Sequence, residues 1–153
     1  KGSYVYAPAN DVMSLYEDID KRKAFSVSVF GTDNIINKYP SGQADTDPII
    51  VCRLGELYLI SAEAQGIAGL QRLNELRSSR GLPAIQPSAS QYADAVQLER
   101  RKELLAEGFR WYDLVRLNKA QSVLGISKAQ LKFPLPESEL VRNKLLEQIE
   151  GYN

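Results

Sequence analysis

The segment from Glu99 to Arg116, ERRKELLAEGFRWYDLVR, constrains the fold of this chain more than any other stretch. Nine of its eighteen side chains are charged, and they alternate with large apolar residues at helical spacing. Glu99, Glu103 and Glu107 follow one another at four-residue steps, which places successive carboxylates on one face of a helix. These charges must be paired or functional, because an isolated buried charge is very costly.

Two interpretations of these carboxylates are open. In the functional one, Glu99 and Glu103 form a retaining glycosidase pair or a divalent-metal site. In the structural one, nearby arginines neutralise the carboxylates and fix the angle between helices. The cations expected in that lattice are Arg100, Arg101, Arg110 and Arg116, and Arg110 would also pair with Asp113. We favour the lattice, because catalytic carboxylates usually face each other across a cleft from separate elements.

The composition removes several classes of function. Nineteen basic and nineteen acidic residues cancel, so no net field would draw the chain to nucleic acid. Histidine is absent from the sequence, and with it the commonest general base and the usual zinc ligand. We therefore expect neither a metal site nor a cofactor, and no nucleic-acid partner.

Cys52 is the only cysteine, so the chain can form no intramolecular disulfide. Free cysteine is usually buried, and we predict that Cys52 is a small core residue. No positively charged segment and apolar stretch precede it as they would precede a lipid-anchored cysteine. No apolar run approaches the roughly 20 residues that span a bilayer, so we expect a soluble chain.

The first third of the sequence is irregular. Residues 1–46 are rich in turn-forming residues and are expected to be mostly loop. A strand is predicted near 24–30, because Phe25, Val27 and Val29 alternate with serines at a period of two.

A first helix hairpin is predicted over residues 47–81. Asp47 would cap its first helix and Pro48 would occupy the first helical position. The second helix would end at Gly81, which suits a left-handed C-terminal residue, and Pro83 would prevent its continuation.

A second helix hairpin is predicted over residues 88–119. Ser88 and Gln91 have the spacing of a capping box at its start. The remainder, 120–153, is expected to be a tail that Pro134 and Pro136 keep extended before a short helix.

The aromatic residues divide into two groups. Phe109, Trp111 and Tyr112 have helical spacing and are expected in the core. Tyr4 and Tyr6 lie in irregular sequence, where loops often present rings to ligands, so they are candidate ligand-binding residues. The same rings could instead pack a chain terminus.

Four blocks of this sequence resemble the C-terminal part of the SusD/RagB family. They are Arg53-Leu54-Gly55-Glu56 with Ser61-Ala62-Glu63-Ala64; Leu73-Asn74 with Arg77 and Gly81-Leu82; Glu99-Arg100-Arg101, Glu103-Leu104, Glu107-Gly108, Arg110, Asp113-Leu114 and Arg116; and Asn143, Leu146, Gln148 and Gly151-Tyr152. The third block is the most specific. The residues expected to form a structural signature are Arg53, Glu56, Glu99, Arg100, Glu103, Glu107, Arg110, Asp113 and Arg116.

The resemblance implies a mainly α fold with tetratricopeptide-like helix hairpins, an irregular N-terminal region, a short strand and an extended tail. It implies that residues 1–153 are the C-terminal part of a surface lipoprotein that captures glycans or other nutrients. The implied partners are an oligosaccharide and a TonB-dependent SusC-like importer barrel in the outer membrane. Membrane attachment would occur only through a lipid anchor that this chain lacks. No sugar-binding residue can be transferred from the family by position.

Two other functions stay open at this stage. The helix hairpins could form a docking scaffold that contacts the importer barrel, as helical repeats commonly do. A glycosidase that uses Glu99 and Glu103 is the third hypothesis.

Overall fold

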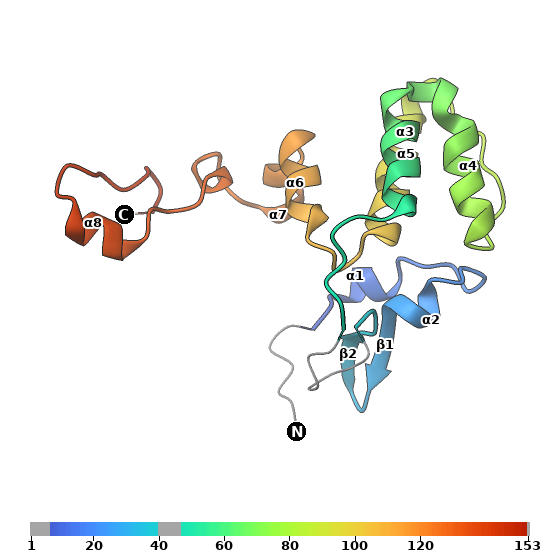
Figure 1. The fold of residues 1–153 in the computed structure, drawn as a ribbon, viewed down its shortest axis with the longest axis horizontal. Helices are drawn as coiled ribbons and strands as arrows, with labels where there is room; N and C mark the ends of the chain where they lie inside the picture. The colour runs from blue at the N-terminus through green and yellow to red at the C-terminus, as the bar shows by residue number, and fades with distance from the viewer. Residues whose placement is uncertain (1–6, 40–46, 153) are drawn as a thin grey trace. The chain divides into compact units, whose positions relative to one another are not determined.

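The computed structural model describes residues 7–39 and 47–152, and it divides the chain into two compact units, Lys1–Gly108 and Phe109–Asn153. Helices dominate the described part, and a small antiparallel sheet is its other regular element (Figure 1). This arrangement confirms the mainly α fold class. In the described residues, no helix has both the length and the apolar character to cross a lipid bilayer.

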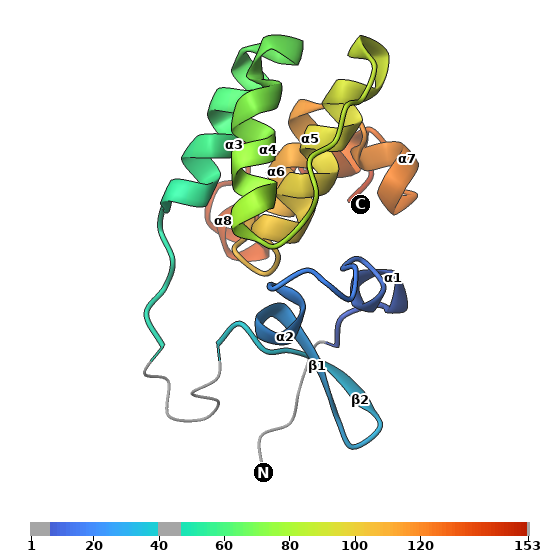
Figure 2. The same cartoon turned by 90° about the vertical axis from the view of Figure 1, so that its right-hand side faces the viewer.

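Three helices form the core of the first unit: α3 (Leu54–Ala64), α4 (Leu70–Ser79) and α5 (Ala89–Glu103). They lie side by side in both views of the ribbon (Figures 1 and 2). Their buried apolar side chains are Leu59, Ala62, Leu73, Leu76, Tyr92 and Val96. Burial of each larger aliphatic side chain stabilises the fold by about 1.5–3 kcal/mol.

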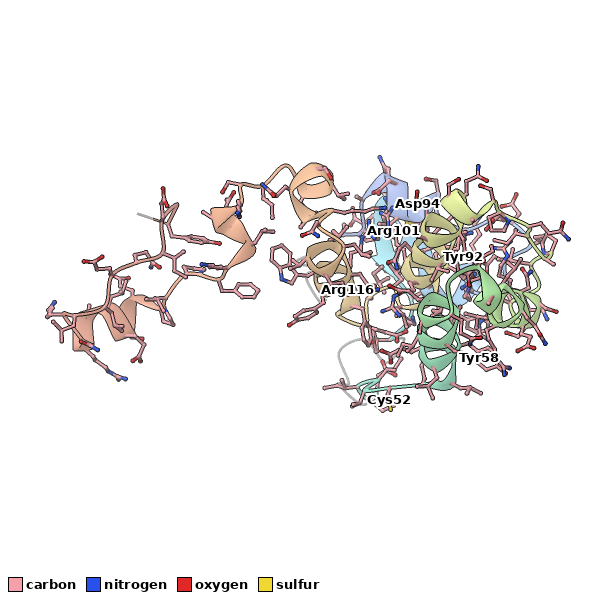
Figure 3. The ribbon with its side chains drawn as sticks, turned by 90° about the horizontal axis from the view of Figure 1, so that it is seen from above. Cys52, Tyr58, Tyr92, Asp94, Arg101 and Arg116 are labelled. Carbon is pink, nitrogen blue, oxygen red and sulfur yellow. The ribbon has the colours of Figure 1, made fainter. Side chains whose placement is uncertain are left out.

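The start of α3 differs from the prediction. The helix begins at Leu54, and the preceding residues 48–53 are outside any helix or strand. Ile49, Ile50 and Val51 are β-branched, and such residues lose side-chain freedom in a helix. Ile49 and Val51 are largely exposed, and so is Cys52, which lies in the segment ahead of α3 (Figure 3). The prediction of a buried Cys52 was therefore wrong.

The hairpin of α3 and α4 has the predicted antiparallel form, joined by a 3-10 turn at Gly66–Gly69 (Figure 1). Gly81 ends α4 with a φ of 80°. The N–H of Leu82 donates to the carbonyl of Arg77 and the N–H of Gly81 to that of Ser78, each at 3.0 Å. These two bonds form a Schellman motif, so the predicted role of Gly81 is confirmed.

The capping box predicted at the start of α5 is present at Ser88 and Gln91. The backbone N–H of Ser88 donates to Oε1 of Gln91 at 3.2 Å. The helix ends at Glu103, and residues 104–108 form turns. Ala106 and Gly108 have φ values of 60° and 85°, which no regular helix can accommodate.

The irregular N-terminal region contains two one-turn helices, α1 (Asn10–Met13) and α2 (Lys23–Ser26). Strand β1 (Val27–Phe30) pairs antiparallel with β2 (Asp33–Ile36). The predicted strand thus starts later than expected, because α2 takes up its first residues. Strand β2 was not predicted, and its burial pattern does not alternate.

The second unit contains the helices α6 (Phe109–Arg116), α7 (Ala120–Leu124) and α8 (Glu137–Arg142), with a 3-10 turn at Ala129–Leu131. The expected extended tail therefore includes α7, which was not predicted. The ring centroids of Trp111 and Phe133 lie 5.9 Å apart, within the range of a favourable aromatic pair. Tyr112 is largely exposed, so its predicted core position is wrong. The packing of the predicted 88–119 hairpin, which spans both units, stays a prediction.

Candidate functional site

The first unit contains a cluster of charged side chains that are mostly buried. We call it the buried charge cluster, and its members are Asp20, Arg22, Lys38, Arg53, Arg77, Arg80, Glu99, Glu103 and Glu107. The carboxylates come from α5, the turn after it and the N-terminal region. The cations come from the N-terminal region, the residue before α3, and α4 with its cap.

Glu103 is the most heavily contacted carboxylate of the cluster. Its Oε2 accepts hydrogen bonds from Nη1 of Arg22 at 2.8 Å and from Nε of Arg80 at 3.0 Å. Its Oε1 accepts from Nη2 of Arg80 at 2.6 Å and from Nη1 of Arg53. Burial raises the pKa of Glu103, but Arg80 and Arg53 outweigh that effect and lower it to about 2.

Glu99 lies one turn earlier on α5 and is 1% exposed. Its Oε2 accepts a hydrogen bond from Nη1 of Arg77 at 2.7 Å. Its Oε1 lies 2.7 Å from Nη2 of Arg22 in an ion pair, although that oxygen accepts no hydrogen bond from any described residue. Glu99 therefore attaches α5 to both α4 and the N-terminal region.

Arg22 also binds Asp20 in a two-point contact. Its Nε donates to Oδ1 at 2.9 Å and its Nη2 to Oδ2 at 2.7 Å. Burial lowers the pKa of Arg22, but Asp20, Glu99 and Glu103 together raise it above its ordinary value. This guanidinium thus stays charged while it contacts three carboxylates.

Glu107 extends the cluster into the turn after α5. Nε of Arg53 donates to both of its oxygens, at 3.1 and 3.0 Å. Nζ of Lys38 donates to Glu107 and to the carbonyls of Glu103 and Leu105, the latter two at 2.9 and 3.1 Å. Burial lowers the pKa of Lys38, and Glu107 opposes this shift. Lys38 thus satisfies carbonyls that the end of the helix leaves open.

This geometry does not suit acid–base catalysis. A glycosidase needs one carboxylic acid of raised pKa to protonate the leaving group. Glu103 has the opposite shift, and both it and Glu99 are buried beneath guanidinium groups that occupy their oxygens. In the part of the chain that the structure describes, no three acidic or cysteine side chains gather as a metal ion would require. The cluster instead holds the N-terminal region, α3, α4 and α5 together.

The structure brings together four of the predicted signature residues: Arg53, Glu99, Glu103 and Glu107. Glu56 is half-exposed in the first turn of α3, apart from the cluster. Arg100 is buried on α5. These positions agree with a structural role for part of the signature only.

Two of the remaining arginines, Arg101 and Arg116, pair with aspartates. Arg101 pairs with Asp11 at 2.5 Å instead of with a glutamate of its own helix. Asp113 is contacted by Arg116 at 2.8 Å, one turn later on α6, and its expected pairing with Arg110 stays a prediction. Tyr4 and Tyr6 lie outside the described residues, so their proposed contact with ligand stays a prediction too.

The sequence did not predict that four further cations bind the glutamates: Arg22, Lys38, Arg77 and Arg80. Two signals were available. Arg77 and Arg80 lie three positions apart, as residues on one face at the end of α4 do. Asp20 and Arg22 form a short pair before the strand, and such a pair suits a bidentate contact.

Comparisons with known proteins give a consistent result. A family model described as the SusD family matches residues 2–132. The SusD-like protein P38 of Formosa agariphila is 34% identical over an alignment of 159 positions, and the alignment covers 87% of this chain. This chain spans 32% of the length of that relative.

Solved structures agree in fold. A SusD superfamily protein from Parabacteroides distasonis superposes with a TM-score of 0.75 at 23% identity, over 95% of this chain and 42% of that one. A SusD-like carbohydrate binding protein from Bacteroides vulgatus gives a TM-score of 0.60 at 27% identity, over 71% of this chain and 26% of that one. The first of these likenesses concerns the fold alone.

Proposed function

Because the chain belongs to the SusD family, we propose that it is part of a non-catalytic glycan-binding protein of an outer-membrane polysaccharide uptake system. The family match over residues 2–132 carries this proposal. A similar solved protein is described as carbohydrate binding, which supports the same class of ligand. The proposal concerns the longer protein, since this chain spans about a third of its curated relative.

The buried charge cluster supports binding over catalysis. Its glutamates are occupied by cations, and Glu103 has no proton to donate near neutral pH because its pKa lies near 2. Such a cluster stabilises a rigid support from which loops can present ligand-binding side chains. A glycosidase based on Glu99 and Glu103 is therefore disfavoured.

The family resemblance also supports proposals on location and partner. We place the longer protein at the cell surface, held to the outer membrane by a lipid anchor. There it would pass its ligand to a TonB-dependent SusC-like importer barrel.

Isothermal titration of the purified protein against a broad panel of oligosaccharides tests this function. We expect saturable binding to at least one glycan and no new reducing ends after prolonged incubation. Hydrolysis of a bound glycan would contradict the non-catalytic assignment. An absence of binding across the panel would contradict the glycan-binding assignment.

A docking role is the second candidate, and one observation favours it. Leu54, Leu57 and Ile60 recur along α3 and are each about half-exposed or more. Exposed apolar side chains at helical spacing are typical of helices that bind a protein partner. Co-purification with the importer barrel should be lost on Leu57→Lys if docking uses this face, and retained if it does not.

A further inference from the structure

The N-terminal region and the helices of the first unit line an open surface pocket of about 240 Å³ beside the buried charge cluster. Five cationic side chains line it, from Lys21, Arg22, Lys38, Arg53 and Arg80, and one carboxylate, from Glu103. No part of the structural role of the cluster requires an open space at this position. The pocket is therefore a candidate binding site.

The charges around the pocket do not cancel. The buried charge cluster holds five cations and four carboxylates, so its net charge is 5 − 4 = +1. Lys21, which lines the pocket outside the cluster, raises this sum to +2. Asp20, Glu99 and Glu107 are absent from the lining, so the surplus of positive charge faces the open space.

Two of the lining cations keep hydrogen-bond donors for a ligand. Arg80 uses Nε and Nη2 on Glu103, whereas its Nη1 donates to no described residue, and its side chain is 31% exposed. Lys21 is exposed and its Nζ has no hydrogen bond to a described side chain. The backbone N–H of Lys21 donates to the carbonyl of Arg80 at 3.0 Å, so the two side chains leave neighbouring points of the backbone.

Glu103 does not neutralise this surplus. Arg22, Arg53 and Arg80 each donate to its carboxylate, so its oxygens are already shared among three guanidinium groups. Lys38 differs from Arg80, because its three donors are used on Glu107 and on two carbonyls. The pocket thus offers an anion the free donors of Lys21 and Arg80.

An aromatic ring adds a second kind of contact. Phe25 lines the same pocket and is 73% exposed. An exposed ring can cover the C–H face of a sugar, while nearby cations bind an acidic group on it. The volume lies below the range of about 300–1,000 Å³ that is typical of pockets for drug-sized ligands, so it suits one sugar unit.

We propose that this pocket binds one acidic sugar unit of the glycan, one that carries a carboxylate or a sulfate group. Lys21 and Arg80 contact the anionic group, and Phe25 covers the ring. This inference rests on the proposed glycan-binding function and names its ligand class, an anionic oligosaccharide.

Matched titrations test the proposal. The probes are a uronate-containing oligosaccharide, a sulfated oligosaccharide, the neutral counterpart of each, and free sulfate. We expect at least one acidic oligosaccharide to bind at least about tenfold more tightly than its neutral counterpart, with an affinity that falls as salt is raised. Free sulfate should bind far more weakly, since it lacks the ring that Phe25 would cover.

Two variants and a matched control complete the test. Lys21→Gln should weaken binding of the acidic oligosaccharide about tenfold and leave the neutral one unchanged. Phe25→Ala should weaken binding of the oligosaccharide without changing the affinity for free sulfate. Lys23→Gln removes the same charge from a lysine outside this pocket, next to Asp18, and should change neither affinity.

The outcomes separate this inference from the proposed function. Equal binding of acidic and neutral glycans, or equal effects of Lys21→Gln and Lys23→Gln, would overturn the acidic subsite and leave glycan binding intact. Binding of free sulfate as tight as the oligosaccharide would show an inorganic anion site instead. A failure of every glycan to bind would overturn both. Thermal melting of each variant checks that these exposed substitutions leave the fold intact.

Discussion

Arg22 and Glu103 lie 81 positions apart in the sequence, yet their side chains form an ion pair of 2.8 Å and are only 9% and 2% exposed. The pair joins the irregular N-terminal region to the last turn of α5. Taking two charges out of water is costly, and only close geometry with further hydrogen bonds compensates for it. Here Arg53 and Arg80 on one side and Asp20 on the other supply those bonds.

Glu103→Gln should strongly destabilise the first unit. The amide keeps the shape of the side chain but removes the charge that compensates three guanidinium groups. Loss of one partner of a buried pair typically costs about 3–5 kcal/mol of unfolding free energy. Urea denaturation followed by circular dichroism measures this change.

Glu75→Gln is the matched control for that experiment. Glu75 pairs with Arg72 at 3.0 Å on the exposed face of α4, where both side chains are open to water. Water screens exposed pairs, so their contribution to stability is small and this variant should unfold near the wild-type midpoint. Equal midpoints for Glu103→Gln and Glu75→Gln would refute a stabilising role for the cluster.

Stability should fall in acid because of Glu103. Its pKa is about 2 in the folded chain against an ordinary value of 4.5, so the unfolded state binds its proton first as the pH falls. The contribution of Glu103 to the free energy of unfolding is present above about pH 4.5 and is lost as the pH drops from there toward 2. The shift corresponds to roughly 3 kcal/mol. Urea midpoints at pH 6, 4 and 3 should fall steeply for wild type and less steeply for Glu103→Gln.

The sequence predicted those parts of the fold that depend on local signals. Spacing within a few residues predicts the capping box at Ser88, the end of α4 at Gly81 and the mainly α fold class. The predicted start of α3 was wrong, because Asp47 and Pro48 suit the start of a helix whereas the β-branched residues after them do not. Competing local signals of this kind are resolved by tertiary packing, which a single sequence does not reveal.

The glutamates of the buried charge cluster could be predicted from the sequence, but their cationic partners could not. The spacing of Glu99 and Glu103 on one face needs only the period of a helix. Their partners lie on other elements: Arg77 is 22 residues from Glu99, and Arg22 is 81 from Glu103. Pairing over such distances depends on how the chain folds back. The prediction therefore assigned the glutamates to arginines nearby in the sequence, such as Arg101.

Gly69→Ala should disturb the turn between α3 and α4. A Cβ at this position would lie 2.8 Å from Cα of Ala62, and closer still to its carbonyl oxygen, so the backbones must move apart. Overpacking of this kind typically costs about 1–3 kcal/mol. The thermal midpoint and the amide exchange of α3 and α4 report the effect.

Gly66→Ala is the comparison for this variant. In the described part of the chain no atom lies within 4 Å of a Cβ added there, and its φ of 55° is what opposes a side chain. The expected cost is about 1–2 kcal/mol, from the left-handed backbone alone. Exchange protection of α3 should then survive in Gly66→Ala and decrease in Gly69→Ala; the reverse order would contradict the steric explanation.

Tyr16→Phe should destabilise the fold without changing the affinity for glycan. Tyr16 is 4% exposed, and its hydroxyl donates to the carbonyl of Lys102 at 2.7 Å, which ties the N-terminal region to α5. Loss of the hydroxyl leaves a buried carbonyl without this donor, at a cost of about 1–3 kcal/mol. Tyr92→Phe removes a similar bond, to Ala62 at 3.0 Å, and should behave alike. Glycan affinities equal to wild type, measured on the folded variants, would agree with a purely structural role.

Cys52 should react readily in the folded protein. It is exposed in the segment ahead of α3, where no helix protects the thiol. We expect a chromogenic disulfide reagent to label one thiol per chain in native buffer at nearly the rate found in urea. Cys52→Ser should abolish labelling and shift the unfolding free energy by less than about 0.5 kcal/mol, as surface substitutions usually do. Labelling only after urea is added would show that the thiol is buried and would contradict this prediction.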